Sequence, residues 1–198
     1  MRISRRIKVW RFLLEWMLAT ALGAIASVAI IVITYSMIPV EDSFKASFFT
    51  PLWLTIIVTS VSAIQWRVLR SYIPRSAGWI VASFIGAYLV GCAQYATSDY
   101  LSLLEVPPSH IAEILIRLAL LGVHGAMFGV IQWVVLMPYL RKAWLWVAVN
   151  GLSFIVGVES FNSWYFGYLL IWWCIFHAIV QATTLGWLFR RLEQETEI

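Results

Sequence analysis

Residues 64–83 read IQWRVLRSYIPRSAGWIVAS, and residues 131–150 read IQWVVLMPYLRKAWLWVAVN. The two stretches share residues at positions that are always 67 apart (132 − 65, 146 − 79). The shared pairs are Gln65 and Gln132, Trp66 and Trp133, Val68 and Val135, Leu69 and Leu136, Tyr72 and Tyr139, and Trp79 and Trp146. Because both stretches lie among apolar residues, the pattern predicts duplicated membrane hairpins and an all-α fold. It predicts an architecture and no particular chemistry.

The composition supports a membrane protein. The chain is 62% hydrophobic and 12% charged, which is about half the charged fraction of a soluble domain. A helix needs about 20 apolar residues to cross the hydrocarbon core. Six segments meet that length, so we expect one six-span membrane domain over residues 1–198, with parallel hairpin repeats. The expected spans are residues 13–38, 51–72, 77–97, 112–138, 143–161 and 164–189.

The prolines and the basic residues indicate how these spans are arranged. Each proline is expected at or beyond a span end, with Pro51 closing the first outer loop. Except for Lys45 and Arg117, every Lys and Arg lies near a terminus or in the turns at 67–76 and 138–143. By the positive-inside rule, both termini are then cytoplasmic, in a bacterial cytoplasmic or internal photosynthetic membrane. The net charge of +4 reflects this topology, so no nucleic-acid partner is expected.

Tryptophan is abundant, with twelve residues in all. Indoles favour the headgroup region, which predicts interfacial anchors at most of these positions. The expected inner set is Trp10, Trp16, Trp66, Trp79, Trp133, Trp144, Trp146 and Trp187, and the outer set is Trp53 and Trp164. Trp172 and Trp173 fall near mid-membrane, where either a packing role or a ligand role is open.

The repeated motif resembles that of a known group of proteins. The chain has Gln-Trp-x-x-Leu at 65–69, then a basic turn, then Gly-Trp-x-x-Ala-Ser at 78–83. This pattern resembles a motif of small multispanning bacterial membrane proteins, mostly of photosynthetic and filamentous lineages. The resemblance covers about residues 55–190 and implies a fold without an established activity. Val134 and Met137 replace two arginines in the second copy. A third copy, which aligns His177 with His124 and Leu185 with Gln132, would give three hairpins about a pseudo-threefold axis.

Several polar and small residues are candidates for helix–helix contacts. Gln65 and Gln132 should point into the bundle, either as clasps to a neighbouring helix or as substrate contacts. Asn150 is expected to make a similar interhelical bond. Small residues allow close approach of helix backbones in a membrane. The candidate packing residues are Gly122, Gly125, Gly129, Ala82, Gly86 and Gly23.

The ionisable residues inside the spans are functional candidates. His124 and His177 fall near the midplane and could bind a haem iron or chlorophyll magnesium. Alternatively, each neutral imidazole bonds a carbonyl or Gln181, or handles protons or substrate. Arg117 could pair with Glu113 at i−4 or form an outward-facing anion site. No other metal site is predicted.

The chain lacks recognisable catalytic motifs such as Gly-x-Ser-x-Gly and His-Glu-x-x-His. We therefore expect a non-enzymatic membrane subunit or scaffold without a cofactor, held in the bilayer beside a membrane-protein partner or a second copy. One alternative is a carrier that resembles the substrate-capture subunits of vitamin transporters, with a polar cavity near Arg117, His124 and Trp164. The other is a haem or chlorophyll protein that uses His124 and His177.

Overall fold

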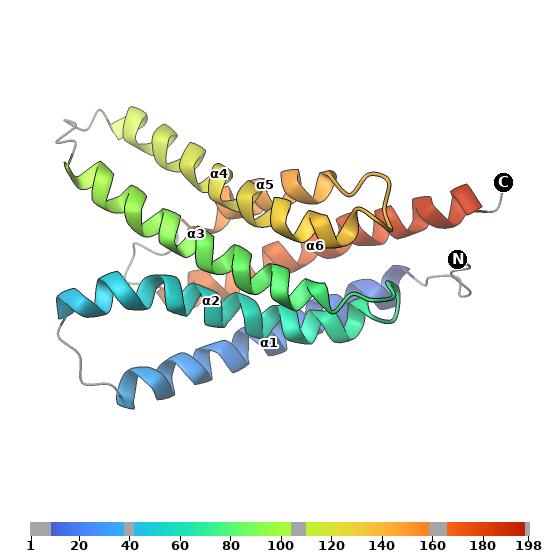
Figure 1. Ribbon diagram of the computed structural model, residues 1–198, viewed down its shortest axis with the longest axis horizontal. Helices are drawn as coiled ribbons and strands as arrows, with labels where there is room; N and C mark the ends of the chain where they lie inside the picture. The colour runs from blue at the N-terminus through green and yellow to red at the C-terminus, as the bar shows by residue number, and fades with distance from the viewer. Residues whose placement is uncertain (1–8, 38–41, 104–109, 159–165, 197–198) are drawn as a thin grey trace.

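A computed structural model describes residues 9–37, 42–103, 110–158 and 166–196, and these residues form six α-helices and no strand (Figure 1). The helices are α1 (Val9–Met37), α2 (Asp42–Leu69), α3 (Gly78–Leu103), α4 (His110–Leu136), α5 (Leu145–Val158) and α6 (Phe166–Thr196). Each predicted span corresponds to one helix. The boundaries differ most for α2, which begins nine residues before the expected start at residue 51.

The six helices form a closed ring. Each helix contacts its neighbours in sequence, and α6 also contacts α1. The start of α1, the end of α6 and the turns at 70–77 and 137–144 all lie at one end of the bundle, which we call the turn end (Figure 1). The chain therefore makes an even number of passes along the bundle axis.

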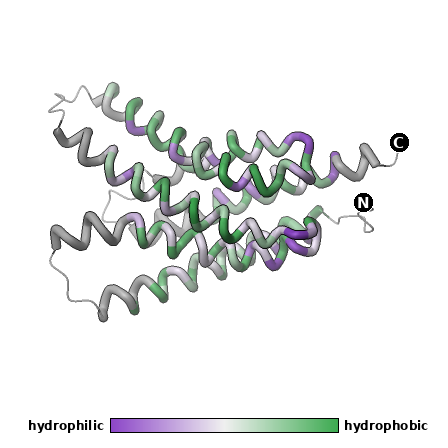
Figure 2. The backbone as a smooth tube through the Cα atoms, viewed as in Figure 1, coloured by the Kyte–Doolittle hydropathy of each residue, from purple (hydrophilic) through white to green (hydrophobic). Residues whose placement is uncertain are grey.

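The exterior of the bundle is apolar over much of its length. Three helices are long and apolar enough to cross a membrane, over Val9–Ile30, Gly78–Thr97 and Leu115–Leu136, when the described residues are searched. Only 28–33% of each of these stretches is buried in the bundle. Large apolar side chains such as Ile25 and Leu152 lie exposed, and the two turns are hydrophilic (Figure 2). An exterior of this kind indicates a membrane location.

Pro51 lies inside α2 and not at the end of a span, so the expectation for this residue is wrong. The reason is the early start of α2 at Asp42. A proline in a helix interior removes one backbone hydrogen bond, and membrane helices compensate through Ser or Thr side chains and neighbouring helices. The Thr55 hydroxyl donates to the carbonyl of Pro51 itself at 2.7 Å, which does not replace the bond that the proline nitrogen cannot make. Gly91 of α3 packs directly on the Pro51 backbone, where a Cβ would lie 2.6 Å from Pro51 Cα.

Three tryptophans fill the core near the turn end. Trp16, Trp79 and Trp146 are fully buried, and they come from α1, α3 and α5. Their ring centroids lie 5.5–6.4 Å apart in every pairing, with tilted or edge-on geometry. The prediction of headgroup anchors is therefore wrong for these three residues. Buried indoles pack on one another instead of facing lipid.

Close backbone contact joins α4 to α5. A Cβ on Gly129 would lie 2.8 Å from Val147 Cα, and one on Gly125 would collide with the Asn150 carbonyl. Gly23 of α1 meets the Val61 backbone of α2 in the same way. Gly122 lies against Ile155 and Gly86 against the Phe128 ring, whereas Ala82 is buried in α3. These contacts fix the distance between neighbouring helices.

Candidate functional site

Three buried glutamines each hold a pair of helices together. Their side-chain amides donate to oxygens on the preceding helix, and we call these three bonds the clasps. The clasps are Gln65 Nε2 to Thr20 Oγ1 at 2.9 Å, Gln132 Nε2 to Ser83 Oγ at 2.8 Å, and Gln181 Nε2 to Asn150 Oδ1 at 3.1 Å. They join α1 to α2, α3 to α4, and α5 to α6.

Each clasp acceptor lies four residues after a buried tryptophan. Thr20 follows Trp16, Ser83 follows Trp79, and Asn150 follows Trp146. Residues four apart share one face of a helix, so each tryptophan and its polar partner both face the bundle interior. A layer of three clasps therefore lies directly beside the layer of three indoles.

Further bonds link the clasps to one another. The Trp146 indole donates to Gln132 Oε1 at 2.8 Å, and Asn150 Nδ2 donates to the Trp146 carbonyl at 2.8 Å. A longer contact of 3.5 Å runs from Gln65 Nε2 to Gln181 Oε1. The network thereby connects side chains from all six helices.

The direction of these bonds fixes the state of His177. The Trp146 carbonyl can only accept, so Asn150 must turn its amide nitrogen toward it and its oxygen toward Gln181. Gln181 Nε2 then donates to Asn150 and also faces His177 Nε2 at 2.6 Å. This imidazole nitrogen must accept, which requires a neutral ring with its proton on Nδ1. The ring nitrogen that most often binds a metal is thus engaged by Gln181.

His124 lies outside the clasp network. It is buried on α4, eight residues or about 12 Å along the helix from Gln132. Its Nδ1 has no hydrogen-bond partner among the described residues. Phe154 of α5 packs on His177 and on Phe128 of α4, with ring centroids 6.4 Å and 6.2 Å away. An aromatic side chain therefore stands between α4 and His177.

Arg117 is exposed on α4, fifteen residues or about 22 Å from Gln132, so it is far from the clasps. The expected partners of the outer half fall outside the residues that the structure describes, in whole or in their side chains. They are Glu113 and Trp164, and the same holds for Trp172 and Trp173, which were expected near mid-membrane. Over the described part of the chain, no group of three or more His, Cys, Asp or Glu residues could hold a metal ion.

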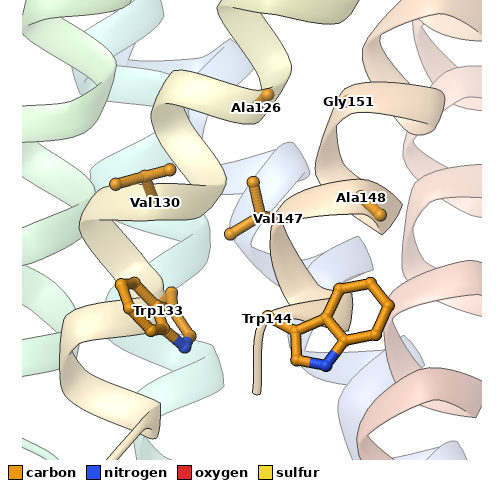
Figure 3. A pocket seen from close by; sticks show the side chains of 7 residues that line it. All are labelled: Ala126, Val130, Trp133, Trp144, Val147, Ala148 and Gly151. Carbon is orange, nitrogen blue, oxygen red and sulfur yellow. The ribbon is translucent and has the colours of Figure 1, made fainter. Parts of the chain in front are cut away.

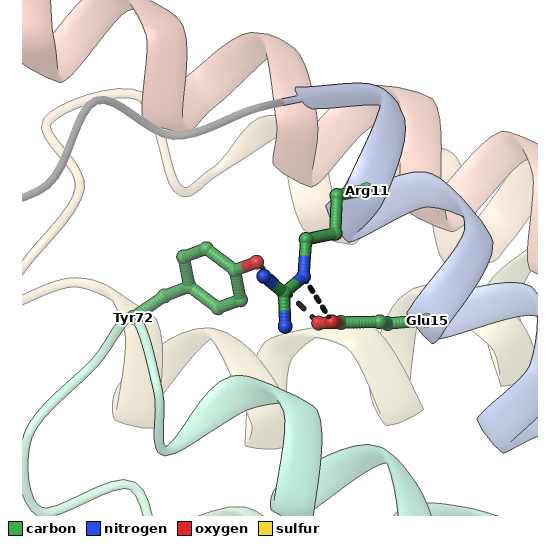
Figure 4. Close-up of polar contacts among 3 residues, drawn as sticks. All are labelled: Arg11, Glu15 and Tyr72. Carbon is green, nitrogen blue, oxygen red and sulfur yellow. Dashed lines mark hydrogen bonds and ion pairs between the residues drawn. The ribbon is translucent and has the colours of Figure 1, made fainter.

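A second polar cluster lies at the turn end, beside the start of α1 (Figure 4). Arg11 Nε pairs with Glu15 Oε1 at 2.7 Å, and the Tyr72 hydroxyl donates to Glu15 Oε2 at 3.5 Å. Tyr72 also packs edge-on against Phe12 and stacks on Phe189. Partial burial, and then the charge of Glu15, raise the pKa of Tyr72 above its ordinary value, so the phenol stays a donor at neutral pH. This cluster joins the first turn to α1 and α6.

An apolar groove runs between α4 and α5 on the outside of the bundle (Figure 3). It has a volume of about 360 Å³. Its lining residues are Ala126, Val130, Trp133, Trp144, Val147, Ala148 and Gly151. The two tryptophans flank it at the turn end, and three of the other lining residues, Ala126, Ala148 and Gly151, are small (Figure 3).

No family model, curated protein or solved structure matches this chain. The proposed assignment of function therefore depends on the geometry above.

Sequence reasoning named the three glutamines and Asn150 but missed Thr20, Ser83 and the tryptophan triangle. The available signal was a tryptophan followed four residues later by Thr, Ser or Asn, which occurs at 16, 79 and 146. The proposed pairing of Leu185 with Gln132 does not describe the clasp on α6. The glutamine that makes this clasp is Gln181, one turn before Leu185.

Proposed function

We propose that this chain is a non-catalytic, six-span integral membrane subunit or scaffold of a bacterial cytoplasmic membrane. The observation that carries the proposal is the clasp network. Its buried amides are bonded to one another and to backbone groups, an arrangement that holds helices in place. A catalytic or transport site would instead direct polar groups toward a cavity.

The length and the arrangement of the helices support six passes. At 1.5 Å per residue, α2 and α6 measure about 42 Å and about 46 Å, which exceeds a hydrocarbon core of about 30 Å. Because both pack in the same ring as the three apolar helices, they would cross with them. α5 is shorter, with 14 residues, and packs between α4 and α6.

The charge pattern supports an orientation with the turn end in the cytoplasm. Exposed Arg67, Arg70, Arg75, Arg141 and Lys142 lie in or beside the two turns. Basic residues of short loops are retained on the cytoplasmic side. Both termini would then be cytoplasmic.

The clasps also support a repeated architecture. Three helix pairs, α1–α2, α3–α4 and α5–α6, each combine a glutamine on the second helix with a tryptophan-plus-four acceptor on the first. We infer three related hairpins about a pseudo-threefold axis, as the resemblance to small multispanning bacterial membrane proteins implies. In such a design the repeats build a rigid frame, and partners bind its outer surface.

The test is extraction of the tagged chain from its native membrane in a mild detergent. We expect a membrane-protein partner, or a second copy, in stoichiometric amounts. Recovery of a monomer that carries a small molecule would contradict the scaffold proposal and favour a carrier. A visible absorption spectrum of the same sample separates the third class, because a haem or chlorophyll protein is coloured.

A further inference from the structure

We propose that the groove between α4 and α5 binds one anionic phospholipid, with an acyl chain in the groove and the phosphate at Lys142. This inference rests on the six-span orientation proposed above, because it places the turn at 137–144 in the inner headgroup region. It adds a specific ligand class that the scaffold role does not require.

The groove has a fixed shape. Gly125 and Gly129 bring α4 and α5 into backbone contact, so the two walls of the groove cannot approach further. Moving them apart would break this close contact. A volume of about 360 Å³ lies at the small end of the usual range for ligand pockets, roughly 300–1,000 Å³. All of its lining side chains are apolar apart from the indole nitrogens, which suits a single hydrocarbon chain.

The turn end of the groove is suited to a lipid headgroup. The rings of Trp133 and Trp144 carry their nitrogens on the side of the turn (Figure 3). Indole N–H groups at this depth can donate to ester or phosphate oxygens. Trp144 is 58% exposed, so its ring is available to a lipid.

Positive charge lies in the turn before α5, two residues before the groove-lining Trp144. Lys142 is exposed in the turn, and its Nζ lies 5.8 Å from the ring centroid of Trp187 on α6. The guanidinium of Arg191 lies 5.2 Å from the same ring. The Trp187 ring thus makes a cation–π contact with each of these two side chains. Clusters of Lys and Arg at the cytoplasmic ends of membrane helices recognise anionic headgroups, which commits the groove to an anionic lipid.

The first copy of the repeat provides an internal control. The positions 67 residues before Val147, Ala148 and Gly151 hold larger side chains, Ile80, Val81 and Phe84. Val81 and Phe84 are 59% and 51% exposed, so they occupy the equivalent surface. The equivalents of Lys142 and Met137 are Arg75 and Arg70, and Arg70 already lies over Trp66 at 5.2 Å.

The experiment is native mass spectrometry of the purified full chain in a mild detergent. The sample contains equimolar phosphatidylglycerol and phosphatidylcholine with identical acyl chains. We expect one phosphatidylglycerol to be retained in preference. Lys142→Gln should lower the ratio of retained phosphatidylglycerol to phosphatidylcholine about fivefold, the effect of one surface charge. The matched variant Arg75→Gln should leave it unchanged, and Lys142→Arg should preserve it.

Filling the groove tests the acyl chain separately. Ala148→Phe should lower the retention of both lipids, whereas Val81→Phe at the matched surface position should not. Circular dichroism and elution volume verify that each variant is folded. Equal retention of the two lipids, or equal effects of Lys142→Gln and Arg75→Gln, would overturn the proposal. A dimer that Ala148→Phe dissociates would assign the groove to a second copy instead.

These outcomes are separable from failure of the scaffold proposal. Labelling that places the turn at 137–144 outside the cell would remove both inferences. Loss of lipid preference with the turn in the cytoplasm would remove this one alone.

Discussion

Gln65 and Gln132 lie 67 residues apart, and both are buried and donate to an oxygen on the preceding helix. Trp79 and Trp146 are also 67 residues apart, and both are fully buried in the triangle of indoles. The surroundings of these residues differ. Gln132 also accepts a bond from Trp146, whereas the Trp79 indole nitrogen has no hydrogen-bond partner among the described residues.

The α2–α3 and α4–α5 pairs also differ in where their backbones meet. Gly125 and Gly129 occupy the positions that Val58 and Ser62 hold in the first copy. The glycines bring α4 against α5, and the small Ala148 and Gly151 leave a groove on the lipid side. The comparison teaches that one core design can carry two different exteriors. The buried hydrogen bonds hold the helices together, whereas the lipid-facing side chains can differ and form a ligand site.

The largest loss of stability should come from replacing Gly125 with valine, the residue found at the equivalent position 58, because Gly125 lies in the close contact between α4 and α5. Gly125→Val would push a side chain into the Asn150 carbonyl and Phe154, so we expect a loss of about 3 kcal/mol in unfolding free energy. The matched change Val58→Ala creates only a small void and should cost about 1 kcal/mol. Reversible unfolding in mixed detergent micelles measures both. Equal costs would show that the α4–α5 contact is not as close as described.

The two indoles of the comparison should respond differently to loss of their N–H group. Trp146→Phe leaves Gln132 Oε1 without its donor, whereas Trp79→Phe breaks no hydrogen bond among the described residues. Both variants lose similar volume, so we expect Trp146→Phe to be less stable by about 1–2 kcal/mol. The same unfolding assay gives the difference. A larger loss for Trp79→Phe would contradict the assigned bond.

The third clasp should contribute a smaller amount. In a double-mutant cycle of Asn150→Ser and Gln181→Leu, we expect a coupling energy of about 0.6 kcal/mol, the average for hydrogen bonds between membrane helices. Unfolding of the two single variants and the double variant yields this energy. Strict additivity would mean that the two side chains do not interact.

The smallest effect concerns the turns. Arg75 has a φ of 60°, and no other non-glycine residue of the described chain has a positive φ. Because this conformation strains a residue with a Cβ, Arg75→Gly should stabilise the protein by about 0.5 kcal/mol. Its counterpart Lys142→Gly has no strain to relieve and should destabilise it by a similar amount. A melting curve of each variant measures the change in stability. Changes of the same sign in both variants would contradict the predicted difference between the two turns.

Much of the helical arrangement could be predicted from the sequence, because long apolar blocks and Gly or Pro at their ends report local structure directly. Six helices were expected, and the described residues form six. The start of α2 was missed because Pro51 was interpreted as a helix end, although it lies inside α2 with Gly91 of α3 packed on its backbone. Tertiary contacts decided this boundary.

The site was predicted in part. A glutamine in an apolar block has few uses other than an interhelical bond, so Gln65, Gln132 and Asn150 could be named. Their acceptors could not, because Thr20 and Ser83 become partners only when the ring of helices closes. The buried tryptophans were misassigned for a similar reason. Indoles at the ends of spans look alike in sequence whether they face headgroups or one another.

The central claim is a ring of three clasped hairpins that crosses the membrane six times with its turn end in the cytoplasm. Single cysteines at Arg75, Lys142 and Glu195, and at Ser109 and Ser163, in a variant without Cys92 and Cys174, test it most directly. We expect a membrane-impermeant maleimide to label Ser109→Cys and Ser163→Cys in intact cells, and the other three only after the membrane is opened. Labelling of Arg75→Cys and Glu195→Cys from opposite sides would contradict the account.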